Sequence, residues 1–302
     1  MPALLTYQVD KNNSGRTVED ILRREFNMSG GVLKSLKHPQ KLLLDGVHCR
    51  TVDKASENQV ILADVSENVL PPENIKPFKA GLNVLYEDDF ILVVDKPGGL
   101  ESHPCMANYE STLANIIMYY WAQKGEYHNY HIVNRLDKGT SGISVIAKNP
   151  FSHGNLSMQT QNNVFKKYYV AMVHGEFNEK SGVIDLPIGR CKEGIIKREV
   201  RDDGKYAKTF YELISNGSRH SLVKIYLETG RTHQIRVHFS HINHPLIGDW
   251  LYGNGDSERH LIDRPALHAK TVEFLHPATK KLMRFDTNLP EEMQNILKLC
   301  EK

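Results

Sequence analysis

The sequence has few cysteines and no long apolar run. Its four cysteines, Cys49, Cys105, Cys191 and Cys300, lie far apart, so none has the spacing of a zinc knuckle or a redox pair. Such usage is typical of free thiols in a reducing compartment. The longest uncharged, apolar-rich stretch, about residues 111–123, is shorter than the ~20 residues that cross a bilayer. Because the first residues also lack the pattern of a secretory signal, we expect a cytoplasmic protein.

A strong excess of one charge is absent as well. The 302 residues include 38 Lys and Arg against 36 Asp and Glu, a formal net charge of +2. This balance neither requires nor excludes a nucleic acid partner, because a basic surface could still be local. Hydrophobic residues make up 40% and charged residues 25%, as in globular proteins, which excludes a wholly disordered chain. The length is typical of about two domains.

A composition break at residues 66–80 divides the chain. This stretch contains three prolines and almost no apolar periodicity, so we expect a linker. It separates a small unit, residues 12–65, from a large unit, residues 81–302.

The small unit has the pattern of two helices followed by short strands. Apolar residues at helical spacing follow Thr17 and Ser29, which can cap the helices. Asp45-Gly46 is a hairpin turn signal. Between residues 20 and 50, basic side chains outnumber acidic ones by six to three. Charge alone leaves two interpretations open, an ordinary solvated surface and an RNA-binding face.

The large unit is rich in short β-type segments. Strands are predicted at residues 84–86, 90–94, 143–147, 168–173, 209–213, 222–227, 267–274 and 282–285. Helices are predicted at residues 112–121, 152–161, 233–242 and 291–299. Because strands and helices do not alternate regularly, a doubly wound parallel sheet is not expected. The pattern predicts an α+β fold with a mixed, mainly antiparallel sheet and helices packed on it.

The segment HIVNRLDKGTSG, residues 131–142, presents an acid in a loop. Polar residues lie between apolar Ile132-Val133 and the strand predicted at 143–147, with two glycines. A carboxylate in a loop on a rigid sheet, here Asp137, is a common way to present a nucleophile or a base. The alternative is that Asp137 only caps a turn or pairs with a neighbouring cation.

The segment TGRTHQIRVHFSHINHPLIGDWLY, residues 229–252, predicts a helix that Thr232 caps. Arg231 and the start of this helix form a plausible phosphate-binding corner. Arg236 lies at the edge of the buried face and could reach a carboxylate in the core. Four histidines follow in this segment, His233, His238, His241 and His244. They form no HExxH pattern and have no cysteine partner, so we predict no metal site here.

Two further segments are less specific. The strand predicted from KKYYVA, residues 166–171, carries aromatic side chains that could belong to the core or stack on a base. The segment VVDKPGGL, residues 93–100, has the pattern of a buried strand that runs into a tight turn. Its expected role is structural, although Lys96 could face a site.

Five motifs, in order, resemble one family. They are LYEDDFILVVDKPGGLESHP, NRLDKGTSG, KKYYVAMVHG, TGRTHQIRVHFSHINHPLIGD and LHAKTVEFLHP, and they cover residues 82–290. The set is similar to the RluA-type RNA pseudouridine synthases. The small unit resembles the alpha-L RNA-binding domain first seen in a ribosomal small-subunit protein, on its helix–helix–hairpin order and the sequence LLLDGVHC.

The resemblance assigns roles to individual residues. It implies that Asp137 is the catalytic aspartate, with an active-site tyrosine at Tyr169 and an arginine that pairs with the aspartate at Arg236. The resemblance also implicates Arg135 in base flipping and matches Lys167 to the lysine of the tyrosine motif. The predicted substrate-binding residues are Arg135, Lys167, Arg231 and Ile235. One departure is Asn134, where the family usually has histidine before Arg-Leu-Asp.

The implied reaction isomerises uridine in RNA to pseudouridine. The bond from ribose to the ring nitrogen breaks, the uracil turns, and its carbon 5 joins the ribose. No redox change occurs and no group enters, so we expect no cofactor and no metal. Asp137 could attack the anomeric carbon or remove a sugar proton, and an adjacent Arg236 would keep the carboxylate ionised.

The expected partner is structured RNA, ribosomal RNA first and transfer RNA second. We expect no membrane contact and a monomer. Two alternatives stay open at this point. One is a catalytically silent RNA-binding or ribosome-assembly protein on the same scaffold. The other is a carboxylate-dependent nucleoside hydrolase, although the sequence offers no second well-placed acid.

Overall fold

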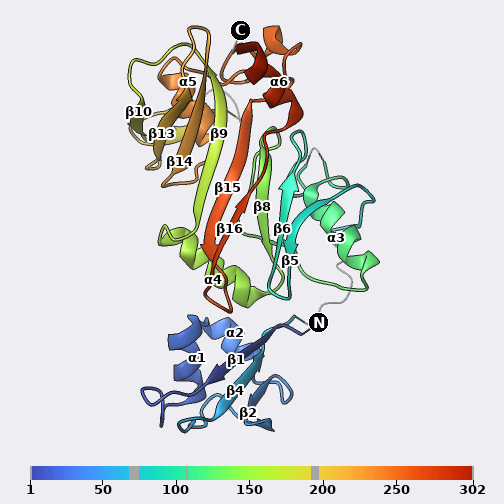
Figure 1. The fold of residues 1–302 in the computed structure, drawn as a ribbon. Coiled ribbons are helices and arrows are strands. Elements are labelled where there is room, and N and C mark those ends of the chain that lie inside the picture. The colour runs from blue at the N-terminus through green and yellow to red at the C-terminus, as the bar shows by residue number, and fades with distance from the viewer. Residues whose placement is uncertain (1, 68–74, 107, 192–196, 301–302) are drawn as a thin grey trace.

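The computed structural model describes residues 2–67, 75–106, 108–191 and 197–300. Its described part contains a four-stranded sheet near the N-terminus, a large sheet of ten strands and a two-stranded sheet (Figure 1). Within that part, no helix combines the length and the apolar character that a membrane crossing requires.

The N-terminal unit packs two helices against a small antiparallel sheet of order β1-β4-β2-β3. Its elements are β1 (Leu4–Gln8), α1 (Val18–Phe26), α2 (Gly30–Ser35), β2 (Leu42–Leu44), β3 (Val47–His48) and β4 (Val60–Asp64). The predicted caps are present, because Thr17 accepts a hydrogen bond from Asp20 N and Ser29 accepts one from Val32 N. Asp45 and Gly46 both have positive φ, as a tight hairpin turn requires.

This sheet begins before residue 12, where we expected the unit to start. β1 pairs with β4 along its whole length, from Leu4 opposite Asp64 to Gln8 opposite Val60. The partner lies more than fifty residues away in the sequence, so no local turn signal marks the pairing. The region predicted as a linker, residues 66–80, is described only in part, since residues 68–74 lie outside the described residues.

The large sheet has the order β10-β13-β14-β9-β15-β8-β6-β5, with β16 beside β15 and β7 beside β8. Its strands are β5 (Asn83–Glu87), β6 (Ile91–Lys96), β7 (His131–Ile132), β8 (Ser141–Ala147), β9 (Lys166–His174), β10 (Ser181–Asp185), β13 (Lys208–Ser215), β14 (His220–Leu227), β15 (Leu267–Leu275) and β16 (Leu282–Asp286). Every pairing is antiparallel except that of β15 with β8. The predicted mixed, mainly antiparallel α+β fold is confirmed.

The remaining elements flank this sheet. They are α3 (Leu113–Gln123), α4 (Pro150–Gln161), β11 (Ile188–Arg190), β12 (Arg198–Val200), α5 (Gln234–His241), the 3-10 helix η1 (Gly255–Glu258) and α6 (Glu291–Cys300). All predicted strands and helices of the large unit are present. The short strands β7, β10, β11 and β12 were not predicted.

The two faces of β9 pack against different helices. Tyr169, Ala171 and Val173 share a buried cluster with Phe239 of α5. The intervening side chains of the strand belong to a second cluster with Met293 of α6. This alternation follows from the two-residue period of a strand. It separates a sheet face with α5 from a sheet face with α6.

The start of α5 differs from the prediction. His233 has a left-handed backbone (φ 59°), and the helix begins at Gln234 rather than after a Thr232 cap. The buried Gln234 side chain fixes this turn instead, because its Oε1 accepts hydrogen bonds from Arg231 N and Thr229 Oγ1, both at 2.9 Å. A side chain inside the helix therefore replaces the usual cap.

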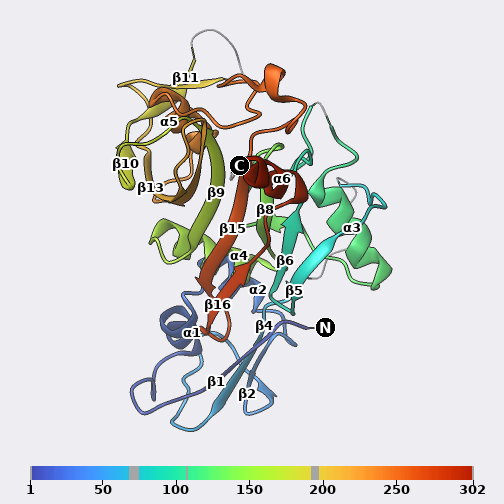
Figure 2. The same ribbon diagram turned by 45° about the horizontal axis from the view of Figure 1, so that its top comes forward.

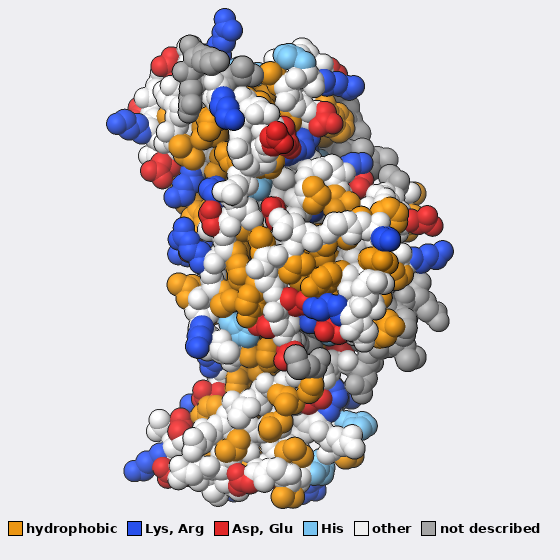
Figure 3. Space-filling model, turned by 45° about the vertical axis from the view of Figure 1, so that its right-hand side comes forward, with side chains coloured by type: hydrophobic (Ala, Val, Ile, Leu, Met, Phe, Trp, Pro, Cys, Tyr) orange, Lys and Arg blue, Asp and Glu red, His pale blue; other side chains and the backbone are white. Residues whose placement is uncertain are grey.

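The N-terminal unit contacts the large unit. Figures 1 and 2 both show α1 and α2 next to α4 and the lower end of β16. The ring of Phe26 meets Phe151 of α4 edge-on, with 6.3 Å between centroids, and Asn155 donates to Phe26 O. Hydrophobic side chains lie on both sides of this junction (Figure 3). The two units share buried apolar surface even though a proline-rich stretch connects them.

Candidate active site

One cavity of about 720 Å³ gathers the residues that the sequence singles out. Its lining includes all seven predicted site residues, Arg135, Asp137, Lys167, Tyr169, Arg231, Ile235 and Arg236. They come from three places in the chain: the loop between β7 and β8, the strand β9, and the turn into α5. Segments up to about one hundred residues apart thus form one surface around Asp137.

Asn134 holds the two sides of the Asp137 loop together. Its side-chain Nδ2 donates to Ile143 O at 2.9 Å, and its Oδ1 accepts from Val145 N at 2.8 Å. The side chain is buried, so both of its polar atoms need such partners. The position of the family's usual histidine is therefore taken by an amide whose two polar atoms both bind the backbone of β8 and support the loop.

The loop backbone around Asp137 is fixed from below. Ser102 Oγ donates to Leu136 O at 2.7 Å, and the Arg264 side chain donates to Gly139 O at 2.9 Å. Thr140 N donates to Asp137 O at 3.0 Å and closes the turn. These contacts use the backbone and leave the carboxylate of Asp137 facing the cavity, with 36% of its side chain exposed.

Lys96 is part of this support. It is fully buried, and its Nζ donates to Pro97 O, Leu100 O and, at 3.4 Å, Lys138 O. Burial, with a smaller contribution from the Arg264 charge, lowers the pKa of Lys96 to about 7. Lys96 does not line the cavity. It joins the end of β6 to the loop that carries Asp137.

Arg236 pairs with Asp249, not with Asp137. The guanidinium donates two parallel hydrogen bonds, Nε to Oδ2 and Nη2 to Oδ1, both 2.7 Å long. Both side chains are buried, and the ring of Tyr252 lies 4.9 Å from the guanidinium. Burial opposes the charge of Arg236, but the Asp249 carboxylate outweighs it and raises the pKa of Arg236, with a further contribution from Asp137. The prediction of a direct Arg236–Asp137 pair is wrong.

His233 is the charged or polar neighbour of Asp137 that sequence reasoning missed. Its Nε2 lies 4.0 Å from Asp137 Oδ2, and its Nδ1 lies 2.9 Å from Tyr252 Oη. Burial is the main cause that lowers the pKa of His233, while the Asp137 charge opposes it and the Arg236 charge adds to it. The left-handed backbone of His233, which a helix prediction does not anticipate, turns the ring toward the loop.

The other wall of the cavity is partly apolar. Tyr169 is 6% exposed, and burial together with the charge of Asp137 raises the pKa of its phenol. Ile235 and Leu136 add buried apolar surface beside it. Burial lowers the pKa of Lys167, which precedes Tyr169 by two positions on β9 and so lies on the same side of the strand.

Two arginines lie at the exposed rim. Arg231 donates from Nε to Tyr206 O at 2.8 Å, which directs its guanidinium along the edge of the cavity. Arg135 is exposed on the Asp137 loop and makes no ion pair with any residue that the structure describes. A partly apolar interior below a cationic rim can hold an uncharged base while the rim contacts phosphates.

Comparison with known proteins decides the family. The sequence profile of the family "RNA pseudouridylate synthase" matches residues 90–241, half of the chain, including the Asp137 loop, β9 and α5. The chain belongs to the RluA-type RNA pseudouridine synthases. It is an isomerase that converts uridine in RNA to pseudouridine.

Relatives of this pseudouridine synthase match over most of its length. The chain is 38% identical to "Uncharacterized RNA pseudouridine synthase YjbO" of Bacillus subtilis over 258 residues, which are 85% of this chain and 89% of that protein. It is 36% identical to "Ribosomal large subunit pseudouridine synthase D" of Xanthomonas campestris pv. campestris over 304 residues, 96% of this chain and 90% of that protein. Neither the silent binding protein nor the hydrolase is favoured by these matches.

A solved structure agrees with the fold. "Human RNA Pseudouridylate Synthase Domain Containing 1" superposes on 73% of this chain and 95% of its own, with a TM-score of 0.58 at 22% identity. Such identity supports the fold of the synthase alone. The family profile matches as far as residue 241, so it includes Arg236 but not Asp249, the partner of Arg236.

Proposed function

We propose that this pseudouridine synthase modifies uridine in ribosomal RNA and that Asp137 carries the reaction. The observation that supports this most is the single cavity in which an accessible carboxylate faces a buried tyrosine and two arginines on the rim. The ribosomal substrate is supported by relatives such as the Xanthomonas protein, whose printed name refers to the large ribosomal subunit.

Asp137 begins the reaction as a carboxylate. It either bonds to the anomeric carbon or removes a sugar proton, and in both routes the bond from ribose to the uracil nitrogen breaks. The uracil turns within the cavity and its carbon 5 bonds to the anomeric carbon. In the first route the bond from Asp137 to that carbon breaks in the same step, and in the second route Asp137 returns its proton to the sugar. The proton of carbon 5 is then removed, and the ring nitrogen freed from the ribose takes up a proton. Asp137 is regenerated. His233 and Arg236 are the cationic or polar groups near this carboxylate: His233 Nε2 lies 4.0 Å from Asp137 Oδ2, and the Asp137 charge contributes to the raised pKa of Arg236.

Tyr169 and Ile235 hold the detached uracil. Their buried side chains form the apolar part of the wall, so the base exchanges slowly with water while it turns. The Tyr169 phenol is protonated at neutral pH, and burial raises its pKa further above the ordinary value. It can therefore stack on the base and donate a hydrogen bond during the proton transfer from carbon 5.

Arg135 fills the place of the flipped base. A stacked uridine reaches the cavity only after it leaves its helix, at a cost of a few kcal/mol. Arg135 is exposed, stands two residues before Asp137 and has no ion-pair partner among the described residues. Its planar guanidinium can stack between the neighbouring bases and compensate part of that cost.

The N-terminal unit grips RNA as an alpha-L domain, and the large unit, residues 81–302, carries the catalysis. Arg24, Lys34 and Lys37 lie exposed on or beside α1 and α2, where phosphates can contact them. At the rim of the cavity, Arg231 adds a cation that phosphates can contact, and Lys167 lies on the wall inside it. Lys192, a basic residue that could also contact RNA, lies outside the described residues.

The test is the product and its position. Unmodified ribosomal RNA and transfer RNA are each incubated with the protein, and pseudouridines are mapped by carbodiimide labelling and primer extension. We expect a new pseudouridine in ribosomal RNA, none with Asp137→Asn, and normal product with the exposed-acid control Asp263→Asn. Modification of transfer RNA alone would overturn the ribosomal assignment. Release of free uracil would overturn the isomerase mechanism at Asp137.

A further inference from the structure

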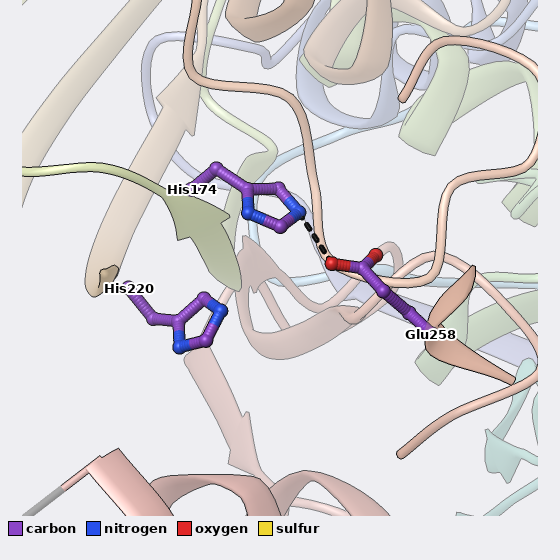
Figure 4. Close-up of side chains that lie close together, drawn as sticks. All are labelled: His174, His220 and Glu258. Atoms are coloured by element: carbon purple, nitrogen blue, oxygen red, sulfur yellow. Dashed lines mark ion pairs between the residues drawn. The ribbon is translucent and has the colours of Figure 1, made fainter. Parts of the chain in front are cut away.

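A second group of chemically active side chains lies on the far face of the sheet. His174 ends β9, His220 begins β14, and Glu258 ends η1. Figure 4 shows the two imidazole rings and the carboxylate turned toward a common space. Their ligand atoms all lie within 4.8 Å of one another, and no other such group of three or more His, Cys, Asp or Glu occurs among the described residues.

The strand register places the two histidines side by side. His220 is directly opposite His174 in the antiparallel pair of β14 with β9. Directly opposite residues have Cβ atoms about 4.5–5.5 Å apart and project to the same face of the sheet. A histidine pair in this arrangement can offer two nitrogen ligands to one ion without a change of the backbone.

Glu258 is the third member of the group and contributes its carboxylate. Its Oε1 lies 2.7 Å from His174 Nε2, while its Oε2 accepts a hydrogen bond from Gly248 N at 2.8 Å. The Nε2 atom of His174 is buried and finds no well-aligned hydrogen-bond partner among the described residues. A separation of 2.7 Å is that of an ion pair in which Nε2 carries a proton, and an ion that displaces this proton gains the lone pair of the nitrogen.

We propose that His174, His220 and Glu258 bind a divalent transition metal ion, with zinc as the ion that the donor set fits best. Two imidazole nitrogens and one carboxylate oxygen are a recurrent three-residue zinc set, with water in the fourth position. Magnesium and calcium prefer oxygen ligands throughout, so the two imidazoles disfavour them. Ligand atoms about 2 Å from one ion lie at most about 4 Å apart, so side-chain shifts of about 1 Å suffice.

The site is separate from the catalytic cavity. His174 lies five positions after Tyr169 on β9, so it projects to the opposite face of the sheet, and neither it nor its two partners lines the cavity. The ion joins two strands to the segment that contains Gly248. Asp249, the next residue, holds Arg236. The metal therefore stabilises the turn that positions Arg236 and takes no part in the reaction.

The test measures zinc binding by the full chain. After removal of metals with a chelator, we expect one zinc per chain in titration calorimetry and a rise in melting temperature of about 5 °C or more. His220→Gln and Glu258→Gln should each weaken zinc affinity at least about tenfold. The amide oxygen introduced by Glu258→Gln can still accept the hydrogen bond from Gly248 N, so the fold of this variant is expected to persist.

A matched control and a spectrum make the outcome decisive. His260→Gln removes an exposed histidine just after η1 and should leave zinc affinity unchanged. Cobalt in place of zinc should give the visible absorption of a four-coordinate site in the wild type, and not in His220→Gln. Overturning results are the absence of saturable binding at one ion per chain, or cluster variants that bind zinc as tightly as the wild type. The pair of His174 with Glu258 would then be a plain ion pair.

Discussion

The two sides of the catalytic cavity are built in opposite ways. On the Asp137 side, supporting groups bind the backbone of the loop and leave the carboxylate without a hydrogen-bond partner among the described residues. On the Arg236 side, the charged group itself is tied by two hydrogen bonds to Asp249. Asp137 keeps 36% of its side chain exposed, against 7% for Arg236.

This difference indicates that Asp137 is the group that reacts, whereas Arg236 contributes a fixed positive charge near it. A free carboxylate can bond to a substrate and let it go again, whereas a guanidinium held in a buried pair cannot move without leaving a charge uncompensated. The comparison predicts that activity and stability respond differently on the two sides.

The largest effect is expected from Asp137→Asn. Product formation should fall about a thousandfold or more, because the reacting carboxylate is lost. Thermal stability should stay within about 1 kcal/mol, since the side chain supports nothing else, and RNA affinity should stay within a few fold. Pseudouridine assays, melting curves and filter binding measure the three quantities. Substantial turnover by this variant would remove Asp137 from its role.

Asp249→Asn should reduce both activity and stability. The variant leaves Arg236 buried without a charged partner, which typically costs about 3–5 kcal/mol. Activity should fall roughly ten- to hundredfold as the arginine shifts. The matched control is Asp256→Asn, which breaks the exposed pair with Arg259 and should cost less than about 1 kcal/mol. Equal unfolding free energies for the two variants would show that the buried Arg236–Asp249 pair contributes no more to stability than the exposed Arg259–Asp256 pair.

Removal of residues 1–65 tests whether the cavity is self-contained. Both of its sides lie beyond the cut, so slow modification should survive at high enzyme concentration. RNA affinity should fall about tenfold and depend less steeply on salt, because fewer phosphates are contacted. The cut removes Phe26 and so exposes the ring of Phe151. The fragment should therefore also be made with Phe151→Ser, to keep it soluble. Unchanged affinity with an unchanged salt slope would leave the N-terminal unit without an RNA-binding role.

A pH-dependent effect on stability is expected from Lys96. The folded pKa of about 7 lies below the ordinary value of 10.5, so the unfolded chain binds the extra proton between these limits. The contribution of Lys96 to the free energy of unfolding therefore rises from pH 7 to about 10.5, by at most about 1.4 kcal/mol per pH unit. In Lys96→Met this slope should be missing. If the unfolding free energies of the two proteins depend on pH in the same way, the lowered pKa of Lys96 would be contradicted.

Sequence reasoning succeeded where the signal is contiguous. Strands such as β6 and β9 alternate or are continuously apolar, and the Asp137 loop lies within one motif, so periodicity and composition predict both. The structure then brings the predicted site residues to one cavity, which no local pattern could establish.

Sequence reasoning failed where residues distant in the sequence pair with each other, or where a residue has an unusual backbone conformation. Asp249 meets Arg236 from thirteen residues away with no periodic relation, and His174 meets His220 only through the register of two strands. β10 lies at the end of its sheet, with Val183 exposed, so its apolar pattern is weak. The left-handed backbone of His233 differs from the helical conformation predicted for this residue, and its neighbours in space decide this conformation.

The contact between His233 and Tyr252 determines where a proton sits. Tyr252 Oη accepts a hydrogen bond from Arg198 N at 2.8 Å, and its raised pKa keeps the phenol protonated. The phenolic proton then finds its acceptor at His233 Nδ1, 2.9 Å away. With Nδ1 occupied as an acceptor, the neutral imidazole carries its own proton on Nε2, the nitrogen that faces Asp137. The ring therefore selects one tautomer, and the carboxylate faces an N–H donor even when the histidine is uncharged.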